Sequence, residues 1–268
     1  MTPIGLDFAQ ALADLRKQAP LVQCLTNIVA ANWTANVLLA AGASPAMVDN
    51  PAEAGHFAGV ASAVLINLGT PYPETVAAMR EAARAAVAAG RPWVLDPVAA
   101  GGLPWRTEVA LELLEQDRPT VIRGNASEVL GLAGASTGGR GADAADSVEA
   151  AALTAIYLAT RYNAAVAVSG PVDYLTDGRT SLTAANGHEW LTRVTGVGCA
   201  LGALMAAFAA VTRNGLEAAT AATAMLTVAA DQAAATTSGP GTFAPALLDR
   251  LASLTPAELA SAARLGHV

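Results

Sequence analysis

Short apolar runs alternate with longer helix-like stretches along most of this 268-residue chain. The apolar runs lack the polar residue at every second position that a half-exposed strand carries, so we expect strands buried on both faces. Strands of this kind, separated by helices, form a parallel sheet that helices cover on both sides. The order of the elements therefore predicts the α/β class, with a central and mostly parallel sheet.

Proline and glycine mark the ends of several expected elements, as at Pro73 and Gly90 around one helix. The expected strands cover residues 21–26, 62–69, 92–98, 119–125, 164–170 and 188–195. The expected helices cover residues 32–43, 73–90 and 147–162, a turn or two after residue 125, and two long alanine-rich stretches after residue 196. Asp177 and Gly178 predict a hairpin. Residues 134–147 are rich in glycine and predict a mobile loop.

The composition favours one domain over residues 1–268. Hydrophobic residues make up 53% of the chain and charged residues 14%, which is ample for a large core. Neither a repeat nor a linker rich in proline and serine divides the sequence.

The charge balance argues against broad anionic partners. A net charge of −7 does not suit nucleic acid or an anionic membrane surface, although it permits a local site for a small anion. Residues 197–211 are apolar, but they are fewer than the roughly 20 that span a bilayer, so we expect a buried helix. The N-terminal residues do not resemble a secretion signal, and we expect a cytoplasmic protein.

Lysine is nearly absent, because Lys17 is the only one in the chain. A phosphate-binding loop that ends in Gly-Lys-Ser or Gly-Lys-Thr is therefore excluded. A pyridoxal Schiff base would have to use Lys17, which lies on an expected exposed helix, so that chemistry is not expected either.

Polar and glycine residues follow most of the expected strands. In open α/β sheets, ligands bind beyond the carboxyl ends of the strands, so residues at these positions are the candidates for a site. They are Thr26, Asn27, Asn67 to Thr70, Asp96, Arg123, Asn125, Glu128, Ser169, Gly170 and Thr195 to Cys199.

Gly196 and Gly198 precede an apolar helix and predict an anion site built without lysine. Glycines let backbone N–H groups converge, and the first N–H groups of a helix have no internal partner. A plain turn from strand to helix is the alternative. A dinucleotide fingerprint fits less well, because the spacing to Gly202 is one residue too long and Glu217 falls inside a helix.

Asp96 and Glu128 follow separate strands and could hold Mg²⁺ through water. Each alone is more often a helix cap or a surface charge. Arg123 could bind a phosphate with its forked guanidinium, or it could form an exposed ion pair.

Cys199 falls at the first or second position of the expected helix, where the pKa of a thiol is lowered. The alternative is a small buried hydrophobic residue. His188 begins the strand that leads to Cys199, so a cysteine–histidine pair is not expected. Cys24 is expected in the core, and two cysteines make no disulfide framework.

The chain resembles the hydroxyethylthiazole kinase family of the ribokinase-like superfamily, from about residue 20 to residue 248. The resemblance rests on the joint order of the segments PLVQCLTNIV, TANVLLAAGASPAMV, LINLGT, LDPVA, IRGNASE, GGRGAD, VSGPVDYLTDG, VTGVGCALGAL and GPGTF. It implies a ribokinase-like fold and transfer of phosphate from ATP to the hydroxyl of 4-methyl-5-(2-hydroxyethyl)thiazole in thiamine salvage. It also implies a homotrimer with its sites between subunits.

The resemblance implies a role for each site residue. It places Met47 and Gly196 at the thiazole with Asn27 nearby, Arg123 and Ser169 at ATP, and Asp96 and Glu128 at Mg²⁺. Gly196, Val197, Gly198 and Cys199 would form the anion hole, with Cys199 as the catalytic residue beside the accepting hydroxyl. Val197 and Ser169 stand where the family often has threonine.

Two other functions remain open from the sequence. One is a different ribokinase-like enzyme, either another alcohol kinase or an ATP-dependent hydrate dehydratase. A dehydratase would be expected to carry aspartate at position 199. The other is a non-catalytic regulator that binds nucleotide. Release of ADP with the thiazole alcohol would separate these functions.

Overall fold

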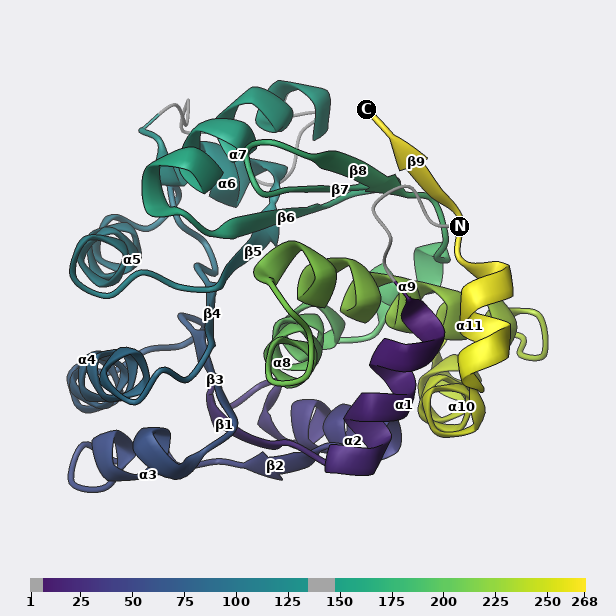
Figure 1. Cartoon of the computed structure of the whole chain (residues 1–268), viewed down its shortest axis with the longest axis horizontal. Helices are drawn as coiled ribbons and strands as arrows, with labels where there is room; N and C mark the ends of the chain where they lie inside the picture. Colours follow the sequence, from purple (N-terminus) through teal and green to yellow (C-terminus); the bar gives the residue numbers. More distant parts are fainter. Residues whose placement is uncertain (1–6, 135–147) are drawn as a thin grey trace.

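A nine-stranded sheet runs through the centre of the computed structural model, which describes residues 7–134 and 148–268 (Figure 1). Its strand order within these residues is β2-β1-β3-β4-β5-β6-β7-β8-β9. The strands are β1 (Leu21–Leu25), β2 (Ser44–Ala46), β3 (Ala63–Asn67), β4 (Trp93–Asp96), β5 (Val121–Asn125), β6 (Ala165–Ser169), β7 (Asp173–Thr176), β8 (Ser181–Ala184) and β9 (Leu265–His267). The strands from β2 to β6 are parallel and the last three pair antiparallel. The prediction of a mostly parallel sheet is confirmed.

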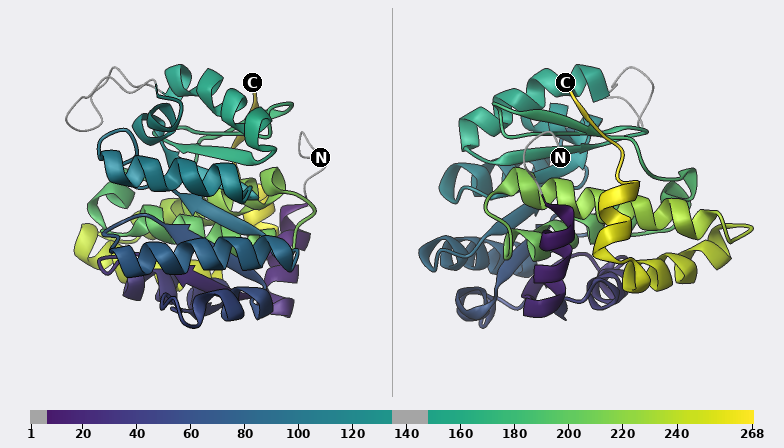
Figure 2. Two further views of the ribbon diagram at one scale, coloured as in Figure 1. Left: turned by 90° about the vertical axis from the view of Figure 1, so that its left-hand side faces the viewer. Right: turned by 45° about the vertical axis from the view of Figure 1, so that its right-hand side comes forward.

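Helices cover both faces of this sheet. One face carries α3 (Ala54–Val60), α4 (Pro73–Ala88), α5 (Pro104–Gln116), α6 (Ala126–Leu132) and α7 (Val148–Tyr162). The other carries α1 (Phe8–Gln18), α2 (Ala31–Ala41), α8 (Val197–Ala209), α9 (Gly215–Ala234), α10 (Pro240–Ser253) and α11 (Pro256–Ala262). Figure 2 shows α4 and α5 side by side across the first face. Each face buries its own hydrophobic core against the sheet.

The strand register brings polar residues to one edge of the sheet. Every residue of β3 is buried, as expected for a strand covered on both faces. Asn67 at its end lies opposite Asp96 at the end of β4, and Asn125 at the end of β5 lies opposite Ser169 at the end of β6. Leu95 of β4 lies opposite Ile122 of β5, so Asn125 and Ser169 extend beyond Asn67 and Asp96 along the same edge of the sheet.

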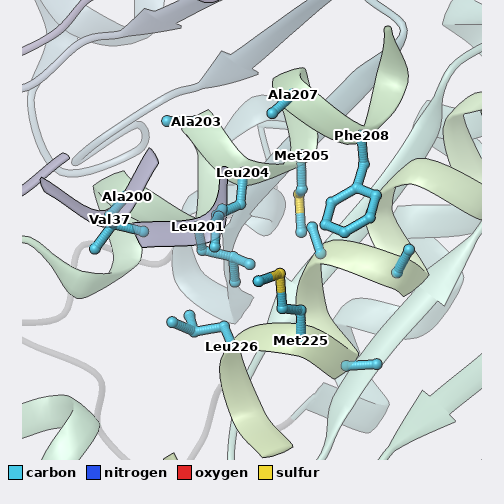
Figure 3. Packing of buried hydrophobic residues seen from close by; sticks show 14 of the residues in the cluster. Val37, Ala200, Leu201, Ala203, Leu204, Met205, Ala207, Phe208, Met225 and Leu226 are labelled. Carbon is cyan, nitrogen blue, oxygen red and sulfur yellow. The ribbon is translucent and has the colours of Figure 1, made fainter. Parts of the chain in front are cut away.

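The alanine-rich helices α8 and α9 pack closely and form much of one core. Met205 and Phe208 of α8 lie beside Met225 and Leu226 of α9 (Figure 3). Residues 200–208 are all buried, so the prediction of a buried helix in this segment is confirmed. Burial of each large side chain contributes about 1.5–3 kcal/mol. Across residues 7–134 and 148–268, no helix is both long enough and apolar enough to cross a membrane.

The predicted strand at residues 188–195 is wrong. Residues 189–193 form a short 3₁₀ helix, η1 (Glu189–Arg193), because His188 Nδ1 accepts a hydrogen bond from the backbone N–H of Trp190 at 3.2 Å. The Trp190 ring packs on His188 and Phe243, away from the sheet. The position beside β8 is instead taken by β9.

Several elements were not expected from the sequence. They are the short β2, α3, β9 and α11 and the longer α5 and α10 (Pro240–Ser253). The hairpin at Asp177 and Gly178 is confirmed, because β7 and β8 pair antiparallel around it. The predicted mobile loop at residues 134–147 lies, apart from Gly134, outside the described residues.

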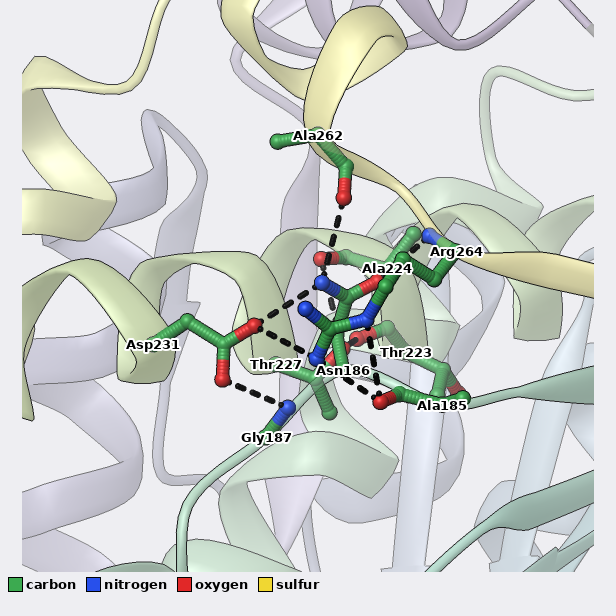
Figure 4. A network of polar contacts seen from close by, with 9 residues as sticks. All are labelled: Ala185, Asn186, Gly187, Thr223, Ala224, Thr227, Asp231, Ala262 and Arg264. Carbon is green, nitrogen blue, oxygen red and sulfur yellow. Dashed lines mark hydrogen bonds and ion pairs between the residues drawn. The ribbon is translucent and has the colours of Figure 1, made fainter.

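A polar network fixes the C-terminal segment to α9 and to the loop after β8 (Figure 4). The buried Asn186 donates to Asp231 Oδ2 at 2.9 Å and to the carbonyl of Ala262 at 3.1 Å. Its Oδ1 accepts from the backbone N–H of Arg264 at 2.6 Å. Three hydrogen bonds hold this amide in one orientation.

Candidate active site

Arg123 links two of the strand ends. It lies on β5, and its side chain is only 11% exposed. Nη1 donates to Asp96 Oδ2 at 3.3 Å, and Nη2 donates to Ser169 Oγ at 3.1 Å. The predicted ATP-binding pair, Arg123 and Ser169, is therefore in direct contact. The ion pair with Asp96 is buried rather than exposed.

Asp96 ends β4 and is fully buried. Its Oδ2 accepts from Asn67 Nδ2 at 2.7 Å and from Arg123, whereas its buried Oδ1 has no hydrogen-bond partner in the structure. Burial raises the pKa of this carboxyl, and the charge of Glu128 raises it further. The charge of Arg123 and the hydrogen bond from Asn67 oppose that shift.

Glu128 is the third residue of α6 and completes a capping box. Its Oε2 accepts from the backbone N–H of Asn125 at 2.8 Å, and Asn125 Oδ1 accepts from the backbone N–H of Glu128 at 2.9 Å. Its Oε1 accepts from the N–H of Ala99 at 3.0 Å. Glu128 is therefore the helix cap that the sequence left open as an alternative to a magnesium ligand. The same hydrogen bonds hold its carboxylate close enough to Asp96 and Arg123 for their charges to interact.

The first turn of α8 faces this cluster without a side-chain cap. Gly196 is the N-cap residue with a φ of +82°, a conformation that suits glycine, and within residues 7–134 and 148–268 no side chain caps the first N–H groups. A methyl group at Gly198 would lie 2.8 Å from Nη2 of Arg123. The predicted anion hole and the predicted ATP-binding arginine therefore lie against one another.

Cys199 is the third residue of α8, one or two positions later than expected. Its Sγ accepts a hydrogen bond from Asn27 Nδ2 at 3.3 Å. Burial raises the pKa of the thiol, and so does the charge of Asp96, whereas hydrogen bonds from Asn27 and Asn67 and the charge of Arg123 lower it. The expectation of a lowered thiol pKa is therefore wrong, because burial outweighs the position on the helix. Cys24 lies in the core as predicted.

The residues predicted to bind the thiazole lie toward the β2 side of the same edge. Asn27 follows β1 and accepts from the N–H of Ala30 at 3.0 Å through its Oδ1. A methyl group at Gly196 would lie 3.0 Å from Ala30 Cβ, so the two segments touch. Met47 follows β2 and is 38% exposed, outside the hydrogen-bonded cluster.

Two residues of the site had no role assigned from the sequence. Asn67 was among the candidates that follow the expected strands, and it contacts both Asn27 and Asp96. Asp173 begins β7, and its Oδ1 accepts from the N–H of Gly170 at 3.0 Å. Burial raises the pKa of Asp173 to about 6, against the charge of Arg123. The sequence signal for Asp173 was its position three residues after Gly170, the glycine that follows β6.

The chain is similar to known proteins over nearly its whole length. The sequence pattern of the hydroxyethylthiazole kinase family matches residues 12–257. A hydroxyethylthiazole kinase from Cutibacterium acnes is 55% identical over 259 residues, which is 97% of this chain and 93% of that protein. The solved hydroxyethylthiazole kinase of Pyrococcus horikoshii OT3 has a TM-score of 0.90 at 39% identity, covering 97% of this chain and 98% of that one.

A more distant structure shares the fold alone. The pyridoxal kinase of Staphylococcus aureus, solved with AMP-PCP and pyridoxal, has a TM-score of 0.58 at 17% identity, covering 79% of this chain and 87% of that one. The predicted ribokinase-like fold is confirmed. The match of sequence over nearly the whole length, on the same fold, leads to one conclusion: the chain belongs to the hydroxyethylthiazole kinase family.

Proposed function

We propose that this protein transfers the γ-phosphoryl group of ATP to the hydroxyl of 4-methyl-5-(2-hydroxyethyl)thiazole, a step of thiamine salvage. The observation that carries the proposal is the contact of Arg123 and Asp96 with each other beside the uncapped first turn of α8. Phosphoryl transfer depends mostly on positioning and on neutralising charge, which such a set supplies. Family membership supports the identity of the acceptor.

The transferring phosphate would lie at the start of α8. The N–H groups of Val197, Gly198 and Cys199 lie in the first turn, where the helix dipole favours an anion. Arg123 adds a forked set of donors that suits phosphate oxygens. Ser169, which already accepts from Arg123, supplies a hydroxyl on the ATP side. This set needs no lysine.

The donor set at Asp96 and Glu128 fits Mg²⁺. Asp96 Oδ1 is a buried carboxylate oxygen without a hydrogen-bond partner in the structure, and a cation would satisfy it. Mg²⁺ binds one or two carboxylates together with water and substrate phosphates. Among the described residues no group of three or more His, Cys, Asp and Glu forms a complete metal cage, and this mode does not require one. When bound, the ion would offset the negative charge of the phosphates.

Cys199 would lie beside the accepting hydroxyl. The alcohol must lose its proton as the new P–O bond forms, and a nearby acceptor assists that loss. The thiol is only a modest base, and its raised pKa keeps it protonated near neutral pH. We therefore assign it a contact and positioning role at the hydroxyl, with no covalent phosphoenzyme. Asn27, Met47 and Gly196 would contact the thiazole.

The active form would be a homotrimer with its sites between subunits. Ile28 is 81% exposed and Val29 is 60% exposed, and both directly follow Asn27. Exposed apolar residues that lie together are typical of a surface that another molecule covers. A second subunit packed here would help enclose the thiazole.

One assay tests the proposed reaction. Purified protein with Mg²⁺, ATP and millimolar thiazole alcohol should release ADP, with a matching thiazole phosphate ester detected by ³¹P NMR. Pyridoxal as the alternative alcohol measures acceptor selectivity in the same assay. If no phosphate ester forms, the kinase function is refuted. Ester formation with pyridoxal alone would leave a kinase with a different acceptor.

A further inference from the structure

Asn67 makes three hydrogen bonds at the centre of the site. It ends β3 and is fully buried. Nδ2 donates to Asp96 Oδ2 at 2.7 Å, and Oδ1 accepts from Asn27 Nδ2 at 2.8 Å and from the N–H of Gly69 at 3.0 Å. The amide therefore connects the carboxylate on β4 with the amide that contacts the thiol.

The orientation of the Asn67 amide is fixed by neighbours that can either only donate or only accept a hydrogen bond. The backbone N–H of Gly69 can only donate, and the ionised carboxylate of Asp96 can only accept. Exchange of the oxygen and nitrogen of Asn67 would set donor against donor and acceptor against acceptor. A buried polar group with mismatched partners is costly, so the observed orientation is strongly preferred.

The same constraint passes on to Asn27. Its Oδ1 accepts from the N–H of Ala30 at 3.0 Å, and its Nδ2 donates both to Asn67 Oδ1 and to Cys199 Sγ at 3.3 Å. With Asn67 fixed, the Asn27 amide presents a donor to sulfur. A methyl group at Gly69 would lie 2.6 Å from Nδ2 of Asn27, so the backbone there also confines this side chain.

We propose that Asn67 is a positioning residue, which acts through Asn27 to keep an N–H donor directed at the sulfur of Cys199. The sulfur is then always the acceptor of that hydrogen bond, and its own S–H, or its lone pair after ionisation, remains available to the accepting alcohol. The inference deepens the proposed kinase reaction and rests on it for its catalytic meaning. The hydrogen-bond arrangement itself does not depend on the substrate.

The chemical consequence is that the chain stabilises the thiolate from one side. A hydrogen bond to the charged form of a group lowers its pKa. Around Cys199, Asn27, Asn67 and Arg123 act in this direction, while burial and the charge of Asp96 act against it. Loss of the fixed donor should therefore raise the pKa of the thiol further.

The first test needs neither ATP nor the thiazole. The rate of Cys199 alkylation by iodoacetamide is measured against pH, with mass spectrometry to follow that residue alone. In Asn67→Leu the midpoint of the profile should move to higher pH, because the freed Asn27 amide no longer holds its N–H toward sulfur. In an Asn27→Leu background the same substitution should add little, whereas an equal shift there would mean that Asn67 acts on the sulfur directly. The midpoint is independent of how far the substitution alters access to the thiol. An unchanged midpoint in the folded variant would overturn the inference.

Asn186→Leu is the matched control. Asn186 is also a buried asparagine with three hydrogen bonds, but its network joins α9 to the C-terminal segment. This variant should lose stability while the alkylation profile of Cys199 stays in place. An equal shift in both variants would mean that general loosening, rather than the donor to sulfur, causes the change. If Asn67→Leu does not fold, Asn67→Ser replaces it, because serine is too short to reach Asp96 and Asn27 together.

A second test uses the enzyme reaction. Asn67→Leu should lower kcat by about 10-fold, with a smaller change in KM for the thiazole alcohol. In a Cys199→Ala background Asn67→Leu should lower kcat much less, because the effect of Asn67 acts through the sulfur. An equal fall in kcat in both backgrounds would refute the proposal that Asn67 acts through Cys199. Absence of kinase activity in the unmodified enzyme would refute the proposed function instead, and the alkylation result would still stand.

Discussion

The guanidinium of Arg123 lies against the α-carbon of Gly198, so that a methyl group there would be 2.8 Å from Nη2 and 3.0 Å from Nη1. The glycine at this position therefore does more than permit a turn. It leaves the space in which the arginine reaches both Asp96 and Ser169.

Gly198→Ala should impair the use of ATP while the fold persists. The long side chain of Arg123 can swing away from a methyl group, but it then loses its contacts with Asp96 and Ser169. Loss of a hydrogen bond to a charged group costs about 1.5–3 kcal/mol, so kcat/KM for ATP should fall by about 10- to 100-fold. Steady-state kinetics at varied ATP would measure this.

Gly59→Ala is the control for that substitution. Gly59 lies in α3, and a methyl group there would meet no atom within 4 Å. Alanine should leave the kinetics unchanged and should favour the helix slightly. If Gly198→Ala kept wild-type kinetics, the position of Arg123 would not matter for the use of ATP.

Glu128→Gln should reduce turnover more than it weakens binding of the thiazole. Removal of one negative charge beside Asp96 and Arg123 alters the groups that face the phosphates, where charge moves during transfer. We expect kcat to fall by about 10- to 100-fold at saturating Mg²⁺. The substitution also weakens the cap of α6, at a cost of about 1 kcal/mol in unfolding free energy.

Glu258→Gln separates these two effects. Glu258 holds the same capping-box position in α11, where it accepts from Thr255, and it is exposed. Its glutamine variant should lose cap stability without a change in kcat. If both variants kept full turnover, Glu128 would be a helix cap and nothing more.

The strand ends explain how much of the site was predictable. Asp96 and Ser169 end buried strands and Arg123 lies within the strand between them, and the carboxyl ends of parallel strands meet at one edge. That rule places the residues, but it does not say which of them touch. The central position of Asn67 depends on the register of β3 with β4, which short apolar runs do not specify.

Tertiary contacts account for the two expectations that changed. The position of Cys199 on α8 suggested a lowered thiol pKa, but packing around the side chain has the larger effect. Residues 188–195 looked like a strand, but His188 bonds the next turn and Trp190 packs on Phe243. Both outcomes depend on tertiary neighbours that a local sequence pattern does not contain.

Assembly should depend on the exposed residues next to Asn27. Ile28→Asp puts a charge on the proposed subunit interface, and burial of an unpaired charge is costly. Light scattering should show a trimer for the unmodified protein and smaller species for this variant, with reduced activity. Leu153→Asp, at a position 77% exposed on α7, should leave both unchanged. An active monomer of the unmodified protein would refute the assembly.

Asp173→Asn should stabilise the protein near neutral pH. The pKa of Asp173 in the folded protein is about 6, above the value of roughly 3.9 in an unfolded chain. The folded state therefore binds more protons between these values, and its stability falls as the pH rises through this window. Asparagine keeps an oxygen for the N–H of Gly170 and removes the partly buried charge.

Urea unfolding of this variant at two pH values tests the sign. At pH 7.5 the variant should exceed the wild type by on the order of 1–3 kcal/mol, and at pH 4 the gain should vanish. Asp49→Asn, at an exposed position, controls for the loss of one negative charge. A gain that is equal at both pH values would show that ionisation of Asp173 is not its cause.

Cys199→Ser should lower turnover modestly, by about 10-fold or less, because a thiol is a mediocre base and the transition state of phosphoryl transfer is loose. Cys199→Asp should retain or raise activity. The new carboxylate can accept the hydrogen bond that Asn27 now donates to sulfur, and it is a better proton acceptor than a thiol whose pKa burial has raised. Its cost is a further negative charge near Asp96, which Arg123 and Mg²⁺ would offset. Kinetics of both variants, with mass spectrometry of the wild type during turnover, decides the role. A phosphate on Cys199, or complete loss of activity in the folded aspartate variant, would rule out a non-covalent role at the hydroxyl.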